Sequence, residues 1–213
     1  MEMPDKYIAE MIDVGRRLCQ RGLLAGTNGN MSIRLDRARI LITGTGVPKG
    51  EMSRKDLVIV DYSGIRLDGE LDPSSEMLMH LFAYQKRSDI GACLHAHPPY
   101  ATSFAVAGKP IEPDVLPEVV LFVGEVPLTK YAPPGTNAVP ESLAPFIASN
   151  NAFLLRNHGL LTLGRSLTEA FHRLETVEHS AHILHLAASL GGATRIPAGD
   201  YERLKEQRRN SEG

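Results

Sequence analysis

Two histidines separated by one small residue follow an apolar stretch near the middle of the chain. Residues 90–94 are apolar or small, which predicts a buried strand. Because side chains alternate across a strand, His95 and His97 are expected to point to the same face. The prolines at 98–99 end the strand, since proline has no N–H to pair. This spacing predicts half of a metal site, whose other ligands must come from elsewhere.

A third histidine occupies a comparable position later in the chain. Residues 152–155 predict a second apolar strand, and His158 comes soon after it, directly before Gly159. Side chains at strand ends often build sites, so His158 is a candidate third ligand. Three imidazoles with one carboxylate or water suit zinc, and Mn²⁺, Co²⁺ and Fe²⁺ are alternatives. Core or surface histidines with ordinary hydrogen bonds are the other interpretation.

Glu76 is the carboxylate nearest to these histidines in sequence. The segment Pro73-Ser74-Ser75-Glu76 predicts the start of a helix, with a serine N-cap and an acidic first turn. Glu76 is therefore either a partner of the helix dipole or a metal ligand and base. Ser74 and Ser75 at a helix start could hold a phosphate beside that metal.

Two further turns are rich in small polar residues. They are Thr27-Asn28-Gly29-Asn30 and Thr43-Gly44-Thr45-Gly46. Backbone N–H groups and hydroxyls in such turns can bind a phosphate without lysine or arginine. Each turn alone is equally typical of a plain hairpin or cap.

A second group of histidines lies in the long helix predicted over about 167–190. Its members are His172, His179, His182 and His185. The last three are spaced by three residues and could chelate a metal in principle. They interleave with Glu175 and Glu178, so we interpret this side as a polar or subunit-facing surface.

The pattern of apolar residues predicts an α/β fold. Helices are expected over about 5–22, from Pro73, over 99–107, after Pro140 and over 167–190, and strands at 40–43, 56–62, 90–94, 119–123, 152–155 and 160–163. The return of 152–155 into 160–163 argues against a purely parallel sheet. We therefore expect three α/β/α layers around a mixed, largely antiparallel central sheet.

Length and composition indicate one globular domain, 1–213, with a charged tail from about 197 that frays or docks on a neighbour. The net charge of −2 predicts no nucleic-acid partner, and no apolar run is long enough to cross a membrane. The N-terminus does not resemble a signal peptide. Cys19 and Cys93 fit reduced thiols, so we expect a cytoplasmic protein.

These residues together resemble the class II aldolase/adducin family, over about 5–192. The resemblance is carried by Gly26-Thr27-Asn28-Gly29-Asn30-Met31-Ser32, Ile42-Thr43-Gly44-Thr45-Gly46, Pro73-Ser74-Ser75-Glu76, His95-Ala96-His97 and Asn157-His158-Gly159. It implies zinc held by His95, His97, His158 and Glu76, and a phosphate pocket formed by Thr27, Asn30, Thr45, Gly46, Ser74 and Ser75. It also implies a C4 homotetramer with active sites at subunit interfaces.

The resemblance implies a zinc-dependent aldolase acting on a sugar phosphate similar to fuculose 1-phosphate. Cleavage would give dihydroxyacetone phosphate and an aldehyde through a metal-stabilised enediolate, with Glu76 moving the proton. The alternatives are a 4-epimerase, a methylthioribulose-phosphate dehydratase or a decarboxylase. A non-catalytic adducin-like scaffold is disfavoured by the retained histidines and Glu76.

The chain departs from the family pattern before the predicted strand at 119–123. Residues 113–118 contain no tyrosine, where fuculose-phosphate aldolases have one that serves the neighbouring site. The second acid or base is therefore unassigned. Glu118 and Tyr201 are its candidates.

Overall fold

The fold is built on one seven-stranded sheet in the strand order β4-β3-β2-β1-β5-β7-β6. The computed structural model describes residues 3–212. The ladders between neighbouring strands of this sheet are antiparallel, and an isolated bridge from Leu128 to Leu154 is parallel. The strands are β1 Asn30–Arg34, β2 Arg39–Thr43, β3 Leu57–Asp61, β4 Arg66–Asp68, β5 Ala92–Ala96, β6 Ala152–Leu155 and β7 Gly159–Gly164.

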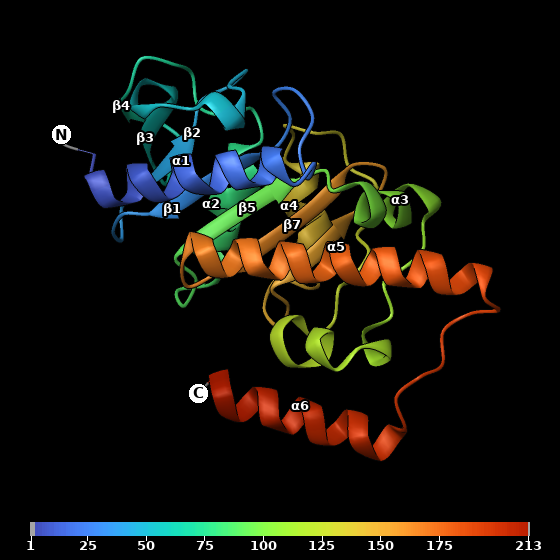
Figure 1. The fold of residues 1–213 in the computed structure, drawn as a ribbon. Helices are drawn as coiled ribbons and strands as arrows, with labels where there is room; N and C mark the ends of the chain where they lie inside the picture. The colour runs from blue at the N-terminus through green and yellow to red at the C-terminus, as the bar shows by residue number, and fades with distance from the viewer. Residues whose placement is uncertain (1–2, 213) are drawn as a thin grey trace.

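Helices cover both faces of this sheet (Figure 1). The α-helices are α1 Asp5–Gln20, α2 Met77–Lys86, α3 Pro99–Ala107, α4 Ala138–Leu143, α5 Leu167–Ser189 and α6 Ala198–Glu212. Shorter helical turns are η1 Lys49–Glu51, η2 Arg54–Asp56, η3 Pro113–Val115 and η4 Val119–Val123. No described helix is both long and apolar enough to cross a membrane. The predicted α/β class with three layers is confirmed.

Two hydrophobic cores lie on opposite faces of the sheet. The first holds the apolar faces of α1, α3 and α5, and the second holds those of α2 and α4. Alternation along each strand divides its residues between them: Leu41 belongs to the first core, whereas Ile40 and Ile42 belong to the second. In β5 the same alternation sends Leu94 to the first core and Cys93 to the second. His95 therefore points to the face that carries α2.

The prediction of a strand at 119–123 is wrong, because this segment forms the π-helical turn η4. The Gly124 N–H donates to the Val119 carbonyl at 2.7 Å, which closes the turn on itself. Val119, Val120 and Val123 are buried, and Phe122 is exposed. A short apolar run of β-branched residues does not distinguish a strand from a buried helical turn.

For the charged tail we expected fraying or docking on a neighbour; the described tail is helical rather than frayed, and docking on a neighbour stays a prediction. From Ala198 it forms α6, which packs against η4 of the same chain (Figure 1). The two cysteines are free thiols, and Cys93 is buried in the second core.

The packing of α1 onto η1 depends on Gly15. A methyl group at residue 15 would lie 2.4 Å from the carbonyl oxygen of Lys49. Alanine normally favours a helix by about 1 kcal/mol over glycine, whereas overpacking costs about 1–3 kcal/mol. Because the contact is with backbone, we expect Gly15→Ala to lower the free energy of unfolding by about 1 kcal/mol or more. Urea unfolding measures this change.

Gly199 provides the matched control for that substitution. It lies in α6, and a methyl group there would meet no atom within 4 Å. Gly199→Ala is therefore expected to leave stability unchanged or to raise it slightly. A Gly15→Ala protein as stable as the wild type would contradict the close approach of α1 to η1.

Candidate functional site

His95 lies near the end of β5, and its imidazole is completely buried. Its Nδ1 is 3.0 Å from the carbonyl oxygen of Leu160 in the neighbouring strand β7. Because a carbonyl can only accept, Nδ1 carries the proton and Nε2 keeps its lone pair. This backbone contact is the kind of support that orients a metal-ligating histidine.

His158 is brought to His95 by the tight connection between β6 and β7. Asn157, in the left-handed region at a φ of 56°, turns the chain there. Gly159 comes next, and a Cβ at this position would lie 2.6 Å from Cδ2 of His97 and 3.2 Å from Cε1 of His95. The glycine after His158 therefore leaves room for the other two imidazoles.

The three histidines predicted from sequence meet at one point. Their ring centroids are 4.9, 4.6 and 5.0 Å apart, and their candidate ligand atoms lie within 4.8 Å of one another. The Nε2 atoms of His95 and His97 are 3.0 Å apart. Glu76 completes the group, with Oε2 3.4 Å from Nε2 of His95 and Oε1 3.2 Å from Nε2 of His158.

The electrostatics of this group favour neutral imidazoles. Burial, together with the nearby His158 and His97, lowers the pKa of His95 well below its usual range. Burial and His158 lower the pKa of His97 to about 4. Burial also lowers the pKa of His158, against the opposing effect of Glu76. Neutral imidazole is the form that binds a metal, so at neutral pH these histidines need not lose a proton first.

One oxygen of Glu76 supplies an independent indication of a cation. Oε1 is buried and has no hydrogen-bond partner among the described residues, although it faces His158. A buried carboxylate oxygen without a partner is costly, and a divalent cation between it and the imidazoles would satisfy it. Three nitrogen donors and one carboxylate suit zinc and related divalent metals. The residues present therefore fit a metal ion.

A buried polar chain holds Glu76 from behind. Asn30 donates from Nδ2 to Oε2 of Glu76 at 2.8 Å, and Oδ1 of Asn30 is 2.5 Å from Nε2 of His80. Nδ1 of His80 is 2.7 Å from the Ser32 hydroxyl, which is 2.8 Å from the Tyr84 hydroxyl. The chain thus runs from the carboxylate into the second core.

The carboxylate of Glu76 determines which atom donates in each of these hydrogen bonds. Because Glu76 accepts from Asn30, Oδ1 of Asn30 must accept from Nε2–H of His80. Nδ1 of His80 then accepts from Ser32. Burial lowers the pKa of His80 to about 3, which keeps the imidazole neutral and permits this single tautomer. His80 and Tyr84 were not predicted from the sequence, although they come after Glu76 at steps of four residues, on one side of the predicted helix.

The segment before α2 differs from its prediction. The helix begins at Met77 with Glu76 at the N-cap position, and Ser74 is not its cap. The Ser74 N–H instead donates to the Thr43 carbonyl at 3.1 Å, and the Thr45 N–H donates to the Asp72 carbonyl at 2.9 Å. Pairing with the end of β2 delays the helix and brings two of the predicted anion-binding turns together.

A cavity of about 390 Å³ opens beside the histidines. It is lined by all six residues expected to form a phosphate pocket, which are Thr27, Asn30, Thr45, Gly46, Ser74 and Ser75. Glu76, His97 and His158 line it as well. Lys49 is a further lining residue that was not predicted from the sequence, although it comes soon after the Thr45-Gly46 turn.

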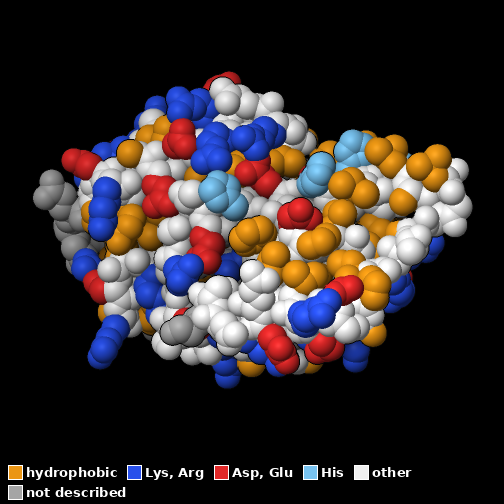
Figure 2. Space-filling view, turned by 60° about the horizontal axis from the view of Figure 1, so that its bottom comes forward, with side chains coloured by type: hydrophobic (Ala, Val, Ile, Leu, Met, Phe, Trp, Pro, Cys, Tyr) orange, Lys and Arg blue, Asp and Glu red, His pale blue; other side chains and the backbone are white. Residues whose placement is uncertain are grey.

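The histidines of α5 do not join this centre. His172 and His185 are exposed, as is His179, and His182 stacks on Tyr100 with ring centroids 3.8 Å apart. Figure 2 shows histidine side chains at the surface among charged and apolar ones. Within the described residues, the only metal-ligating group of three is His95, His97 and His158. The interpretation of this side of α5 as a polar or subunit-facing surface stays a prediction.

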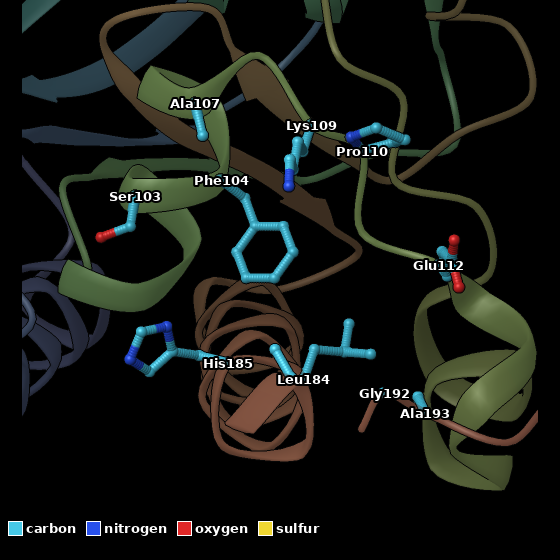
Figure 3. Close-up of a pocket in the computed structure, with 11 residues that line it drawn as sticks. Ser103, Phe104, Ala107, Lys109, Pro110, Glu112, Leu184, His185, Gly192 and Ala193 are labelled. Carbon is cyan, nitrogen blue, oxygen red and sulfur yellow. The ribbon is translucent and has the colours of Figure 1, made fainter. Parts of the chain in front are cut away.

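A larger cavity of about 440 Å³ lies elsewhere, between α3 and the end of α5 (Figure 3). Phe104 and Leu184 contribute apolar side chains to it, and neither Glu76 nor the three clustered histidines line it. Glu118 is exposed, and Tyr201 lines a different cavity, beside η4. Neither of these candidate acids lines the metal-centre cavity of its own chain.

Comparisons with known proteins found similar chains and a similar solved structure. A protein described as L-fuculose phosphate aldolase from Methanococcus maripaludis is 34% identical over 183 residues, covering 86% of this chain and 98% of that protein. A 3-oxo-tetronate 4-phosphate decarboxylase from Haemophilus influenzae is 34% identical over 178 residues, covering 81% and 84%. A solved structure described as L-fuculose 1-phosphate aldolase superposes with a TM-score of 0.90 at 33% identity, covering 97% and 98%.

The family model for the class II aldolase and adducin N-terminal domain matches residues 9–185. That range contains the three histidines, Glu76 and every turn that lines their cavity. With these matches beside the geometry, the chain belongs to the class II aldolase and adducin N-terminal domain family, as an enzyme of its metal-dependent aldolase and lyase type.

Proposed function

We propose that this protein is a zinc-dependent aldolase that cleaves a phosphorylated ketose to dihydroxyacetone phosphate and an aldehyde. The observation that carries the proposal is the unpartnered oxygen of Glu76, which faces neutral imidazoles at the edge of a cavity lined by small polar turns. The names of the relatives support a sugar phosphate as substrate.

His95, His97 and His158 would hold the metal, with Glu76 as the fourth donor. Nitrogen donors favour zinc, and Mn²⁺, Co²⁺ or Fe²⁺ could occupy the same donors. When bound, the metal would supply a Lewis acid that stabilises negative charge on substrate oxygens as the carbon–carbon bond breaks. The backbone contact of His95 with Leu160 would keep that ring in its ligating orientation.

The small polar turns would bind the phosphate group of the substrate. Thr27, Thr45, Ser74 and Ser75 offer hydroxyls, and backbone N–H groups in the same turns add further donors. Asn30 connects this pocket to the proton chemistry, because its side-chain amide hydrogen-bonds Glu76. The distance between phosphate and reacting carbons would then be fixed by the short segment from Ser74 to Glu76.

Glu76 would act as the base. Its side chain is 13% exposed and lines the cavity, so its carboxylate could accept a proton from a bound substrate. Asn30, held by His80, would keep Oε2 in place while Oε1 faces the substrate carbon. In aldol cleavage Glu76 would give a proton to that carbon, and in the reverse, aldol-forming reaction it would remove the proton.

We also propose that the active unit is a C4 homotetramer with active sites at subunit interfaces. The supporting observation is apolar surface on the face shown in Figure 2, together with exposed apolar side chains such as Phe122, which is 63% exposed. Leu190, at the end of α5, is 86% exposed. Glu118 or Tyr201 from a neighbour could then supply the second acid or base.

The two free thiols support a cytoplasmic location.

Decarboxylation is the strongest alternative, because the Haemophilus influenzae relative bears that name. Epimerisation at C4 and dehydration of a methylthioribulose phosphate would use the same cavity and the same base. An adducin-like scaffold is less favoured, because the arrangement of Glu76 and the imidazoles is retained.

A substrate panel separates these reactions. Ketose 1- and 5-phosphates and a 4-phosphorylated 3-oxo acid are incubated with the protein, with and without a chelator. We expect dihydroxyacetone phosphate from one or more ketose 1-phosphates, loss of this product with chelator, and recovery with zinc. Release of carbon dioxide from the oxo acid, without any dihydroxyacetone phosphate from the ketoses, would overturn the aldolase proposal in favour of a decarboxylase.

Replacement of Glu76 tests the base. Glu76→Gln keeps the shape and a hydrogen bond to Asn30 but removes the proton-accepting oxygen. We expect the exchange of solvent deuterium into dihydroxyacetone phosphate to fall about 10²-fold or more. Glu141→Gln, on the exposed surface of α4, is the matched control and should exchange normally. Exchange at the wild-type rate in Glu76→Gln would show that another group is the base.

A further inference from the structure

Lys49 places a positive charge in the cavity of the metal centre. Lys49 is the first residue of η1 and is only 2% exposed. It lines the cavity together with Thr27 and Ser74. Its Nζ donates to the carbonyl oxygen of Thr27 at 2.8 Å. The ammonium is thus fixed at the loop expected to contact phosphate.

The stem of Lys49 is held beneath α1. Gly15 of α1 packs directly against the backbone and Cβ of Lys49, and Gly50 packs against Cys19. These contacts fix the backbone and Cβ of Lys49, and burial of the residue together with the bond to Thr27 fixes its ammonium.

The ammonium of Lys49 forms no direct ion pair in the described part of the chain. Its hydrogen-bond partner is the uncharged carbonyl of Thr27, and no described carboxylate lies within ion-pair distance. Burial lowers its pKa to about 8, although Cys19 and Glu76 favour the charged form. A buried ammonium without a direct ion pair is costly, and an anion bound in the cavity would offset that cost.

We propose that Lys49 is the counter-ion of the substrate's phosphate group and makes the site specific for phosphorylated ketoses. This inference rests on the proposed function, because it assigns the phosphate to the same cavity. The turns supply neutral donors, whereas a phosphate dianion carries two charges. Hydrogen bonds between charged partners are roughly twice as strong as neutral ones, so Lys49 supplies a contribution that hydroxyls and backbone N–H groups lack.

A structural role is the competing explanation. Lys49 joins η1 to the loop at Thr27, and this bond alone could explain its burial. The two explanations differ in their dependence on phosphate. A structural link affects all substrates of the cavity equally, whereas a counter-ion affects only those that carry the phosphate.

The first test measures the binding of inorganic phosphate by isothermal titration calorimetry to the purified holoenzyme. Lys49→Met keeps an unbranched stem and removes the charge, and Lys55→Met, at an exposed lysine of η2, is the matched control. We expect Lys49→Met to weaken phosphate binding about tenfold or more and Lys55→Met to leave it unchanged. Wild-type affinity in Lys49→Met would overturn the proposal.

The second test separates charge from structure. In the deuterium-exchange assay, Lys49→Met should raise KM for dihydroxyacetone phosphate much more than it lowers kcat, and should leave kcat/KM for unphosphorylated dihydroxyacetone unchanged. Lys49→Arg, which keeps the charge, should recover phosphate binding. Equal losses with both substrates, or a loss of phosphate binding in Lys49→Arg as severe as in Lys49→Met, would assign Lys49 a structural role.

Proton uptake gives a readout independent of catalysis. At pH 8.5 inorganic phosphate is already a dianion, and an anion beside Lys49 raises the pKa of its ammonium. Cys19 on α1 and Glu76 before α2 are the other titratable groups that act on Lys49. Calorimetry in buffers of different ionisation enthalpy should show proton uptake by the wild type and less by Lys49→Met. Equal proton uptake by the two proteins would contradict the role of Lys49 even if the aldolase activity is confirmed. Conversely, phosphate binding that depends on Lys49, without any aldol cleavage, would support the role of Lys49 and overturn the proposed reaction.

Discussion

The site depends on one electrostatic constraint, which is the carboxylate of Glu76 with its buried Oε1 facing neutral imidazoles. Its Oε2 is occupied by Asn30, and its Oε1 is left without a hydrogen-bond partner among the described residues, facing His158. Neutral imidazoles cannot neutralise the carboxylate, and their candidate ligand atoms lie within 4.8 Å of one another. A divalent cation would satisfy both groups, because it would accept the imidazole lone pairs and balance the charge of the carboxylate. The rest of the fold serves to hold these groups in place.

The sheet positions the candidate metal ligands through strand register together with the β6–β7 connection. Antiparallel pairing of β5 with β7 brings His95 beside the Leu160 carbonyl, and the β6–β7 connection returns His158 to the same edge. The segment before α2 pairs with the end of β2, and this pairing places Glu76 beside the histidines. Behind it, His80 and Tyr84 extend the hydrogen bonds into a core that is otherwise apolar. The carboxylate is therefore held by Asn30 of β1, which His80 of α2 supports in turn.

Short-range periodicity accounts for the features that could be predicted from the sequence. The alternation around His95 and His97, the strand end before His158 and the amphipathic helices were predictable, because each depends on neighbouring residues. The π-helical turn at 119–123 was not predictable, since buried β-branched residues suit a strand equally well. The start of α2 was predicted too early, because the long-range pairing with β2 outweighs the capping preference of serine. Lys49 was missed because its burial beneath α1 depends on a contact with Gly15, which lies far from it in sequence.

Metal analysis of His97→Ala tests the central claim most directly. In the described part of the chain no hydrogen bond joins the His97 ring to the backbone, so its removal should leave the sheet register intact. Elemental analysis of the purified wild type should give about one divalent ion per chain, zinc foremost. His97→Ala should lose that ion, while His179→Ala, at an exposed histidine of α5, should retain it. A wild-type metal content in folded His97→Ala protein would contradict the metal centre and the mechanism built on it.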